Sequence, residues 1–170
     1  MKILDLGAGC NKWKSEGDEI IGLDREKGEG IDVVCDLEKG TLPFKDSEFD
    51  LVVASHVLED LSHSSFFSIM EELKRIMKTG ALLKIWIPNG SSHQFYNNPS
   101  HRHGFGIGSF RTLGFIVEKK EFRFTFTHQP VRWAWLNAVF NPLLNLWQGF
   151  TEKFIPFVPD ELYFELRCEK

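Results

Sequence analysis

The sequence predicts a single α/β domain built on a doubly wound, mainly parallel, Rossmann-like sheet with an antiparallel strand near the C-terminus. Three observations support this fold class. Short apolar runs in the first half each stop at an aspartate or a glycine-containing loop. One run, "FDLVVAS", is continuous and rich in valine, as is typical of a strand buried on both faces of a parallel sheet. The last third contains two stretches in which apolar and polar residues alternate.

Five strand-like runs occupy the first half of the chain. They are Lys2–Leu6, Glu19–Leu23, Ile31–Cys35, Phe49–Ser55 and Ala81–Pro88. Only nine residues, Cys10–Asp18, separate the loop after the first run from the second run. A parallel crossover usually takes about a dozen residues or more. We therefore expect the first helix of the fold to be shortened or replaced by a loop.

One amphipathic helix is predicted between the fourth and fifth runs. The apolar residues that share its face at helical spacing are Phe66, Ile69, Met70, Leu73, Ile76 and Met77. We expect Ser64 or Ser65 to cap its start, and residues 78–80 to end it with a lysine and a glycine. Glu71 stands four residues before Arg75, a spacing that allows an ion pair on the helix surface.

The last third differs in composition, because it is rich in phenylalanine and tryptophan. Alternation over 122–127 and 162–168 predicts a closing antiparallel pair. Between them, residues 131–157 read as a helical, aromatic-rich insertion that Pro142 should kink or divide. This insertion could be a lid, a homodimer face, a membrane-surface contact or ordinary core. A helix that lies on a membrane surface usually has a basic polar face, and this insertion has few basic residues. A membrane contact is therefore less favoured than a lid or core. We keep residues 1–170 as one domain.

Composition limits the classes of function. The net charge of −4 and the pI near 5.9 argue against nucleic acid as a partner, since bulk nucleic-acid binding needs a basic surface. No apolar run reaches signal-peptide or membrane-span length, which favours a cytoplasmic protein without a transmembrane segment. Three cysteines without a CxxC pair favour reduced thiols. No metal is expected, because His93, His101, His103 and Asp60 lie in loops that do not fix a ligand set.

The stretch "ILDLGAGCN" predicts a ligand-binding loop after the first strand. Gly7 and Gly9 fit the start of a dinucleotide fingerprint, but Lys12 stands at the third glycine and no P-loop pattern is present. Asp5 would repel a pyrophosphate and attract a cation. Asp24 ends the second run nineteen residues later, where a carboxylate accepts hydrogen bonds from ribose hydroxyls. The predicted ligand combines a ribose with a cationic end, as S-adenosyl-L-methionine does.

The chain resembles the class I S-adenosylmethionine-dependent methyltransferases of the methyltransferase type 11 kind. The stretches that carry the resemblance are "ILDLGAGCNKW", "IIGLD", "DVVCDLEKGTLPFKDSEFDLVVASHVLEDL" and "ELKRIMKTGALLKIWIPN", in this order. The tail resembles compact members with a shortened first helix, through "NPSHRHGF" and "DELYFELR".

The resemblance implies roles for particular residues. The methionine portion would contact Asp5, Leu6, Gly7, Ala8, Gly9 and Cys10. Asp24 would bind the ribose hydroxyls, and Asp36 and Leu37 would lie along the adenine. The methionine and methyl side would be lined by Ser55, His56 and Val57.

Methyl transfer is a direct displacement, in which the protein mainly aligns the reactants. A general base helps only where the acceptor must lose a proton. Histidine titrates near neutral pH, so His56 and His101 are base candidates, and His93, Tyr96 and His103 are further ones. The acceptor is expected to be a small molecule.

Two other functions are compatible with parts of the sequence. A nicotinamide-dependent oxidoreductase shares the glycines and Asp24 but is disfavoured by Asp5 and Lys12. A catalytically silent, methyltransferase-like module that pairs with another subunit is suggested by the short first crossover and the aromatic tail. The retained pair of Asp5 and Asp24 argues against it.

Overall fold

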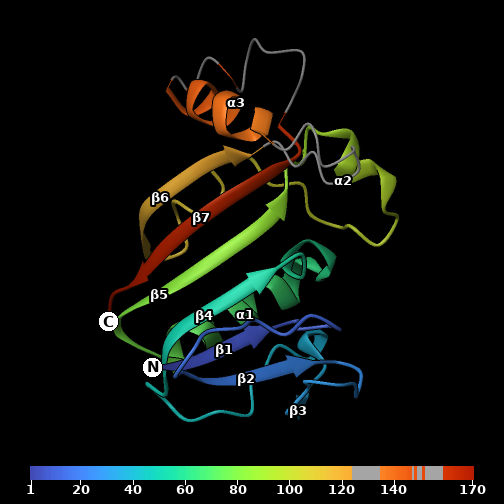
Figure 1. The fold of residues 1–170 in the computed structure, drawn as a ribbon. Helices are drawn as coiled ribbons and strands as arrows, with labels where there is room; N and C mark the ends of the chain where they lie inside the picture. Colours follow the sequence, from blue (N-terminus) through green and yellow to red (C-terminus); the bar gives the residue numbers. More distant parts are fainter. Residues whose placement is uncertain (124–134, 147, 149–150, 152–158) are drawn as a thin grey trace.

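A computed structural model describes residues 1–123, 135–146, 148, 151 and 159–170. In this part of the chain one seven-stranded sheet has the order β3-β2-β1-β4-β5-β7-β6 (Figure 1). The strands are β1 (Lys2–Leu6), β2 (Glu19–Asp24), β3 (Val33–Val34), β4 (Phe49–Ser55), β5 (Met77–Pro88), β6 (Phe115–Arg123) and β7 (Glu161–Cys168). The first five pair in parallel, and β7 runs antiparallel between β5 and β6. The predicted fold class is confirmed.

The helices are few and unevenly distributed. The α-helices are α1 (His63–Ile76), α2 (His93–Asn97) and α3 (Trp135–Leu146), and the 3-10 turns are η1 (Leu37–Lys39) and η2 (Leu58–Asp60). Residues 10–18, between β1 and β2, contain turns but no helix. The expected replacement of the first helix by a loop is therefore confirmed.

β1 lies between β2 and β4. From β1 the chain adds β2 and β3 on one side of the sheet and then β4 and β5 on the other. Leu6 pairs in register with Leu23 on one side and Ala54 on the other. The loops that follow β1, β2 and β4 therefore leave the sheet at one edge. This is the switch point where open α/β sheets bind ligands.

Helix α1 differs from the prediction at both ends. Its N-cap is Ser62, whose hydroxyl oxygen accepts a hydrogen bond from the Ser65 N–H at 3.4 Å. Its C-terminus runs directly into β5 at Met77, so the expected stop over residues 78–80 is wrong. Met77 is fully buried and pairs with Phe49. Residues 78–80 thus belong to a strand, although their local sequence favours a helix end, because the sheet pairs this segment with β4.

The charges on α1 also pair differently from the expected spacing. Arg75 contacts Glu72 at 2.7 Å, and Glu71 contacts Lys74 at 2.8 Å. Both are pairs three residues apart. Arg75 also donates hydrogen bonds to the carbonyl oxygens of Leu42 and Phe44, which lie beyond the helix. This direction of the side chain favours the contact with Glu72.

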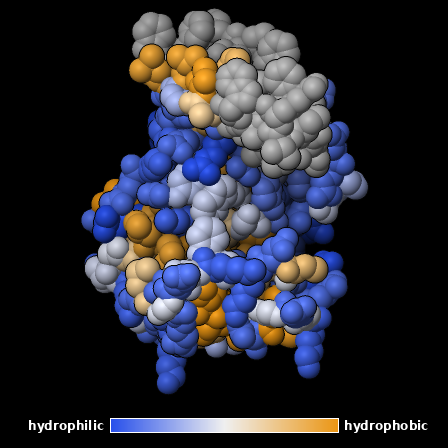
Figure 2. Space-filling model, in the orientation of Figure 1, coloured by the Kyte–Doolittle hydropathy of each residue, from blue (hydrophilic) through white to orange (hydrophobic). Residues whose placement is uncertain are grey.

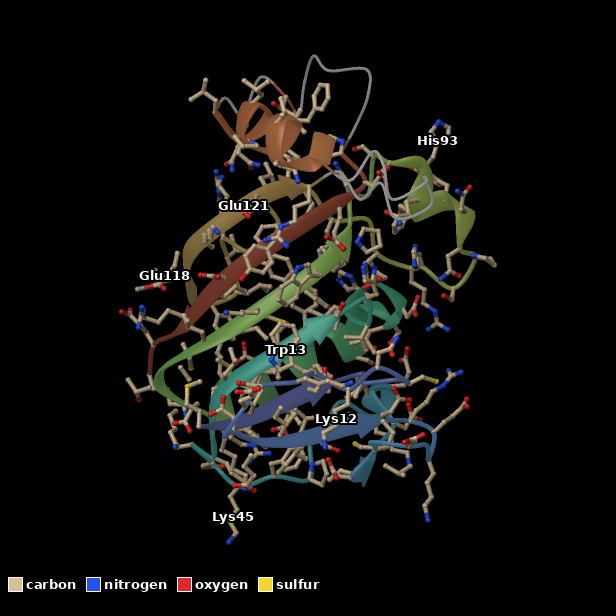
Figure 3. The ribbon with its side chains drawn as sticks, viewed as in Figure 1. Lys12, Trp13, Lys45, His93, Glu118 and Glu121 are labelled. Atoms are coloured by element: carbon tan, nitrogen blue, oxygen red, sulfur yellow. The ribbon has the colours of Figure 1, made fainter. Side chains whose placement is uncertain are left out.

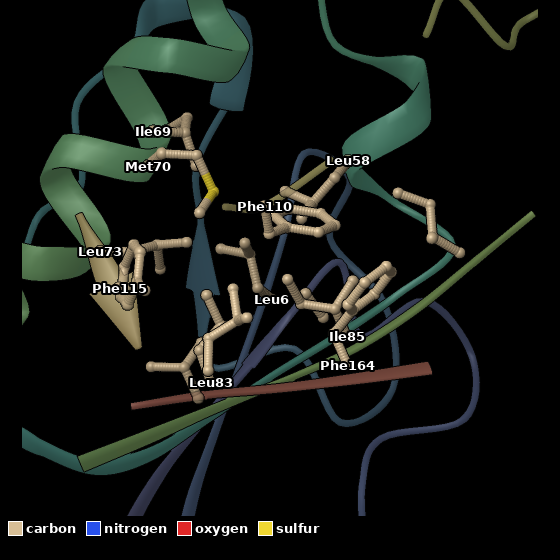
Figure 4. Packing of buried hydrophobic residues seen from close by; sticks show 14 of the residues in the cluster. Leu6, Leu58, Ile69, Met70, Leu73, Leu83, Ile85, Phe110, Phe115 and Phe164 are labelled. Atoms are coloured by element: carbon tan, nitrogen blue, oxygen red, sulfur yellow. The ribbon is translucent and has the colours of Figure 1, made fainter. Parts of the chain in front are cut away.

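The main core lies between the sheet and α1. Leu6, Leu83, Ile85 and Phe164 from the sheet face Ile69, Met70 and Leu73 from the helix (Figure 4). The stretch after α2 adds two stacked rings, Phe105 and Phe110, whose centroids lie 5.5 Å apart. The predicted buried stripe is confirmed for its five residues in α1, whereas Met77 belongs to β5.

The opposite face of the sheet carries only a thin cover. Ile3, Leu51 and Val53 form a small second cluster there, with Trp86 packed against it. In the described part of the chain α1 lies behind the parallel strands, and only the loop after β1 crosses in front of them (Figure 1). Parallel sheets are normally covered by helices on both faces. In the described part of the chain, the short first crossover therefore leaves this face to one loop and to the side chains of the sheet.

The C-terminal third confirms the antiparallel pair but shifts it. β6 spans Phe115–Arg123 instead of 122–127, and residues 124–127 lie outside the described residues. β3 is likewise shorter than the predicted Ile31–Cys35. Helix α3 continues through Pro142, so the proline does not divide it. The Asn145 amide donates to the Phe122 carbonyl oxygen at 2.9 Å and fastens α3 to β6.

Most of the predicted insertion over 131–157 lies outside the described residues. Its described helix, α3, exposes the apolar side chains of Val139, Phe140, Leu143 and Leu146, seen as orange atoms at the top of Figure 2. None of the described helices is long and apolar enough to cross a membrane.

Candidate functional site

Two pockets meet at Gly7, at the edge of the sheet where β1 and β4 end. The first pocket, of about 500 Å³, is lined by Gly7, Asp24, Arg25, Asp36, Leu37, Glu38, His56, Val57, Asp60, Leu61, Pro99, Ser100 and Arg102. The second pocket, of about 560 Å³, is lined by Asp5, Gly7, Ala8, Gly9, Cys10, Asn11, Trp13, Val53, Ser55 and Trp86. Together they form a divided cavity around the glycine loop.

Only glycine fits at position 7, where the two pockets meet. Its φ of 72° lies in the left-handed region, and a Cβ there would come within 2.7 Å of Val57 Cγ2. The N–H groups of Gly7 and Ala8 both donate to the Leu23 carbonyl oxygen, at 2.8 and 3.0 Å. The chain thus turns sharply across the end of β2, and its backbone is exposed to a ligand.

Asp24 holds the loop in this shape. Its Oδ2 atom accepts from the Gly9 N–H at 3.0 Å, and its Oδ1 atom accepts from the Glu26 N–H at 3.2 Å. Each carboxylate oxygen can accept a second hydrogen bond. The side chain lines the first pocket and can therefore receive a pair of neighbouring hydroxyl groups there.

Asp5 presents a buried negative charge to the second pocket. Its side chain is 5% exposed and accepts one hydrogen bond, from the Trp13 N–H at 2.6 Å. Burial raises the pKa of Asp5, against the opposing effect of that hydrogen bond and of Lys12. Within the described ranges Asp5 has no ion pair, and Lys12 pairs with Asp32 instead. A ligand cation would fit beside this carboxylate.

His56 lies between two carboxylates. Its Nε2 atom is 3.0 Å from Glu161 Oε1 and its Nδ1 atom is 3.5 Å from Glu59 Oε1. Hydrogen bonding to Glu161, and then to Glu59, raises the pKa of His56 to about 9. The imidazole is therefore protonated at neutral pH, with both N–H groups turned to carboxylates. This geometry favours a link between β4, η2 and β7 over a proton acceptor.

His101 also has both ring nitrogens occupied. Its Nδ1 atom lies 2.9 Å from the Phe95 carbonyl oxygen, and its Nε2 atom lies 3.1 Å from the Asn98 amide nitrogen. A neutral ring that donates to Phe95 and accepts from Asn98 satisfies both contacts. His101 lines neither pocket. The structure thus places it in a supporting position.

The other base candidates also lie outside both pockets. His93 and Tyr96 are exposed on α2, and the His93 side chain points outward (Figure 3). His103 packs its ring 5.6 Å from that of Phe66, and burial lowers its pKa. In the described part of the chain, no three of the His, Cys, Asp and Glu side chains are placed to hold a metal ion.

The structure brings together eleven of the twelve residues predicted to bind the cofactor, since these eleven line one or both pockets. Leu6 is the exception, because its side chain is fully buried in the core. Asp36 lines the first pocket and also caps η1, where its Oδ1 atom accepts from the Glu38 N–H at 3.1 Å. The divided cavity thus contains the whole predicted set except Leu6.

Several pocket residues were not predicted from the sequence. Pro99, Ser100 and Arg102 enter the first pocket because the Arg102 and His103 N–H groups donate to the Glu59 carbonyl oxygen, at 2.7 and 3.1 Å. Ser100 donates to Asp60 at 2.7 Å. The stretch "NPSHRHGF" was the available signal, but its loop path is set by these long-range bonds.

Trp13 and Trp86 are also new, and they line the second pocket. Trp13 comes from the loop that replaces the first helix. The shortness of that crossover was the only sequence signal for its position. Trp86 comes from β5, and its position on the sheet face follows from strand alternation.

Comparison with known proteins agrees with this geometry. Residues 5–85 match a family model described as a methyltransferase domain. The ubiquinone/menaquinone biosynthesis C-methyltransferase UbiE of Burkholderia mallei is 27% identical over 123 residues, which cover 56% of this chain and 49% of the relative. The match thus spans about half the length of that relative.

Solved structures share the fold over nearly the whole chain. A SAM-dependent methyltransferase from Archaeoglobus fulgidus has a TM-score of 0.70 and 23% identity, covering 98% of this chain and 85% of that one. A SAM-dependent methyltransferase from Methanosarcina mazei has a TM-score of 0.64 and 14% identity, covering 99% and 93%. Residues 5–85 thus match the methyltransferase-domain family, and the strand order agrees with the fold that the chain shares with these SAM-dependent methyltransferase structures.

Proposed function

We propose that this chain transfers a methyl group from S-adenosylmethionine to a small-molecule acceptor. The observation that carries the proposal is the pair of carboxylates on either side of Gly7. Asp24 lines the first pocket, and the buried Asp5 lines the second. One suits ribose hydroxyls and the other suits a cation, so a ligand that spans both pockets needs both chemical groups.

The residues fit such a cofactor in two parts. In the first pocket, Asp24 would hold the ribose, and Leu37 and Asp36 would lie along the adenine. In the second pocket, Asp5 would face the ammonium group of the amino-acid end. When bound, S-adenosylmethionine supplies a methyl group on a positively charged sulfur, which an aligned nucleophile can displace.

The contribution of the protein would be alignment. Effective alignment of two reactants can lower a barrier by about 7–11 kcal/mol. The acceptor would enter the first pocket beside Asp60, Ser100 and Arg102, which line it together with Asp24. These polar side chains suit a small polar acceptor better than a purely apolar one.

The environment of His56 favours acceptors that need no strong base. Its ring is protonated near neutral pH and its N–H groups face Glu59 and Glu161. His101 is similarly engaged. The acceptor would therefore arrive with a free electron pair, or lose its proton to solvent as the new bond forms. The relatives named as C-methyltransferases of quinone biosynthesis make phenolic acceptors a reasonable first group to screen.

Calorimetric titration tests the proposal. S-adenosylmethionine, S-adenosylhomocysteine and NADH would be titrated into the wild type and into Asp24→Ala, with Glu26→Ala as a matched control. Glu26 is an exposed carboxylate two residues away that lines neither pocket. We expect both adenosyl ligands to bind the wild type and Glu26→Ala, and to bind Asp24→Ala at least about tenfold more weakly.

Two results would overturn the proposal. Binding of NADH alone would indicate an oxidoreductase. Binding of none of the three ligands by folded protein would indicate a methyltransferase-like module without catalysis.

A further inference from the structure

The loop that replaces the first helix brings Trp13 over the sheet face. The Trp13 N–H donates to Asp5, and its ring centroid lies 5.6 Å from that of Trp86. Figure 3 shows the Trp13 side chain in front of the central strands. The residue is 36% exposed and lines the second pocket, so part of the indole is open to a ligand there.

Trp86 is held much more firmly than Trp13. Its ring centroid lies 4.7 Å from that of Tyr163 on β7. The Arg123 guanidinium lies 4.2 Å from the Tyr163 ring centroid and 5.9 Å from that of Trp86. Trp86 is therefore a fixed wall of the second pocket, and Trp13 closes the pocket against it.

The second pocket combines two indole rings with a buried carboxylate that has no ion-pair partner in the described part of the chain. The faces of indole rings attract cations, and they also cover methylene groups. Asp5 attracts a cation and repels an anion. The combination suits a short alkyl chain that ends in an ammonium group.

We infer that Trp13 selects ligands by their amino-acid end. With Asp5 and Trp86 it would bind the methylene and ammonium groups of an adenosyl amino acid, in the space that the missing helix leaves open. This inference rests on the proposed function, because it assigns the second pocket to the amino-acid half of the same cofactor. The adenosine half lies in the first pocket and does not depend on Trp13.

Two ligands that differ only at the amino-acid end test the inference. S-adenosylhomocysteine has that end, whereas 5′-methylthioadenosine keeps the adenosine and the thioether without it. Both would be titrated into the wild type, Trp13→Ala and Trp13→Phe. Phe67→Ala is the matched control, since Phe67 is an aromatic residue of α1 that is 44% exposed and lines neither pocket.

We expect Trp13→Ala to weaken binding of S-adenosylhomocysteine by about tenfold or more, and binding of 5′-methylthioadenosine by less than about twofold. Trp13→Phe should retain most of the affinity, and Phe67→Ala should leave both ligands unchanged. An equal change for the two ligands in Trp13→Ala, or no change for either, would overturn the inference alone. Failure of the wild type to bind either ligand would overturn the proposed function as well.

Tryptophan fluorescence provides a second measurement that does not depend on the stability of Trp13→Ala. In the wild type, S-adenosylhomocysteine should change the emission more than 5′-methylthioadenosine does. That difference should become smaller in Trp13→Phe, because only Trp86 then reports from the second pocket. A difference that persists unchanged in Trp13→Phe would contradict the inference.

Discussion

The Nε2 atom of His56, at the end of β4, lies 3.0 Å from the carboxylate of Glu161, at the start of β7. The two residues are 105 positions apart in the sequence. Their contact joins the parallel part of the sheet to its antiparallel part, across the top of β5. His56 itself has a φ of 51°, an uncommon backbone conformation for a residue with a side chain. The link therefore holds a strained residue in place beside the first pocket.

The first prediction concerns the pH dependence of stability. The pKa of His56 is raised from 6.5 to about 9 in the folded chain. The stabilisation from this link is therefore fully present below pH 6.5 and is lost as the pH rises through about 9. In Glu161→Gln we expect a lower pKa of His56 by NMR titration and a smaller loss of stability over this pH range. A His56 that titrates near 6.5 in the wild type would contradict the prediction.

The second prediction concerns Gly7. Gly7→Ala should destabilise the chain by about 1–3 kcal/mol and abolish detectable cofactor binding, because the new Cβ combines a left-handed backbone with a clash against Val57. Gly9→Ala is the control, since Gly9 has a φ of 53° but no atom within 4 Å of an added Cβ. Urea unfolding should therefore show a smaller effect at Gly9. Equal effects at the two glycines would show that the contact with Val57 is unimportant.

The third prediction separates stability from binding at Asp5. Burial raises the pKa of this carboxyl, so its ionised form opposes folding at neutral pH. Asn can still accept the hydrogen bond from Trp13. We expect Asp5→Asn to melt at the same temperature as the wild type or higher, and to bind S-adenosylmethionine at least about tenfold more weakly. A variant that melts lower and binds normally would show that Asp5 is purely structural.

The fourth prediction concerns Arg75, which fastens α1 to the segment before β4. Its guanidinium contacts Glu72 and Asp46, and donates to the carbonyl oxygens of Leu42 and Phe44. Arg75→Met should lower the free energy of unfolding by about 1–3 kcal/mol, because two carbonyl groups lose their donors. Lys74→Met is the control. Its pair with the exposed Glu71 should contribute less than about 1 kcal/mol, as surface pairs do. Similar losses in both variants would contradict this account.

The sequence alone determined β1, β4 and the glycine loop, because these depend on local patterns. The continuous run of Phe49–Ser55 predicted β4 with its observed bounds. Gly7 and Asp24 were singled out because a tight turn needs a positive φ and because a carboxylate at a strand end is typical of a ribose site. The nine residues between the glycine loop and the second strand were too few for a full crossover helix, and the loop there followed from chain length.

Only the tertiary structure decided what lies around that loop. Met77 joined β5 because its partner across the sheet is Phe49 and its side chain is fully buried. His56 became a link instead of a free imidazole because folding placed Glu161 beside it. Trp13 reached Trp86 because no helix stands between them. In each case the decisive contact joins residues distant in sequence. Local periodicity carries no information about such contacts, since their energies arise only when the sheet has formed.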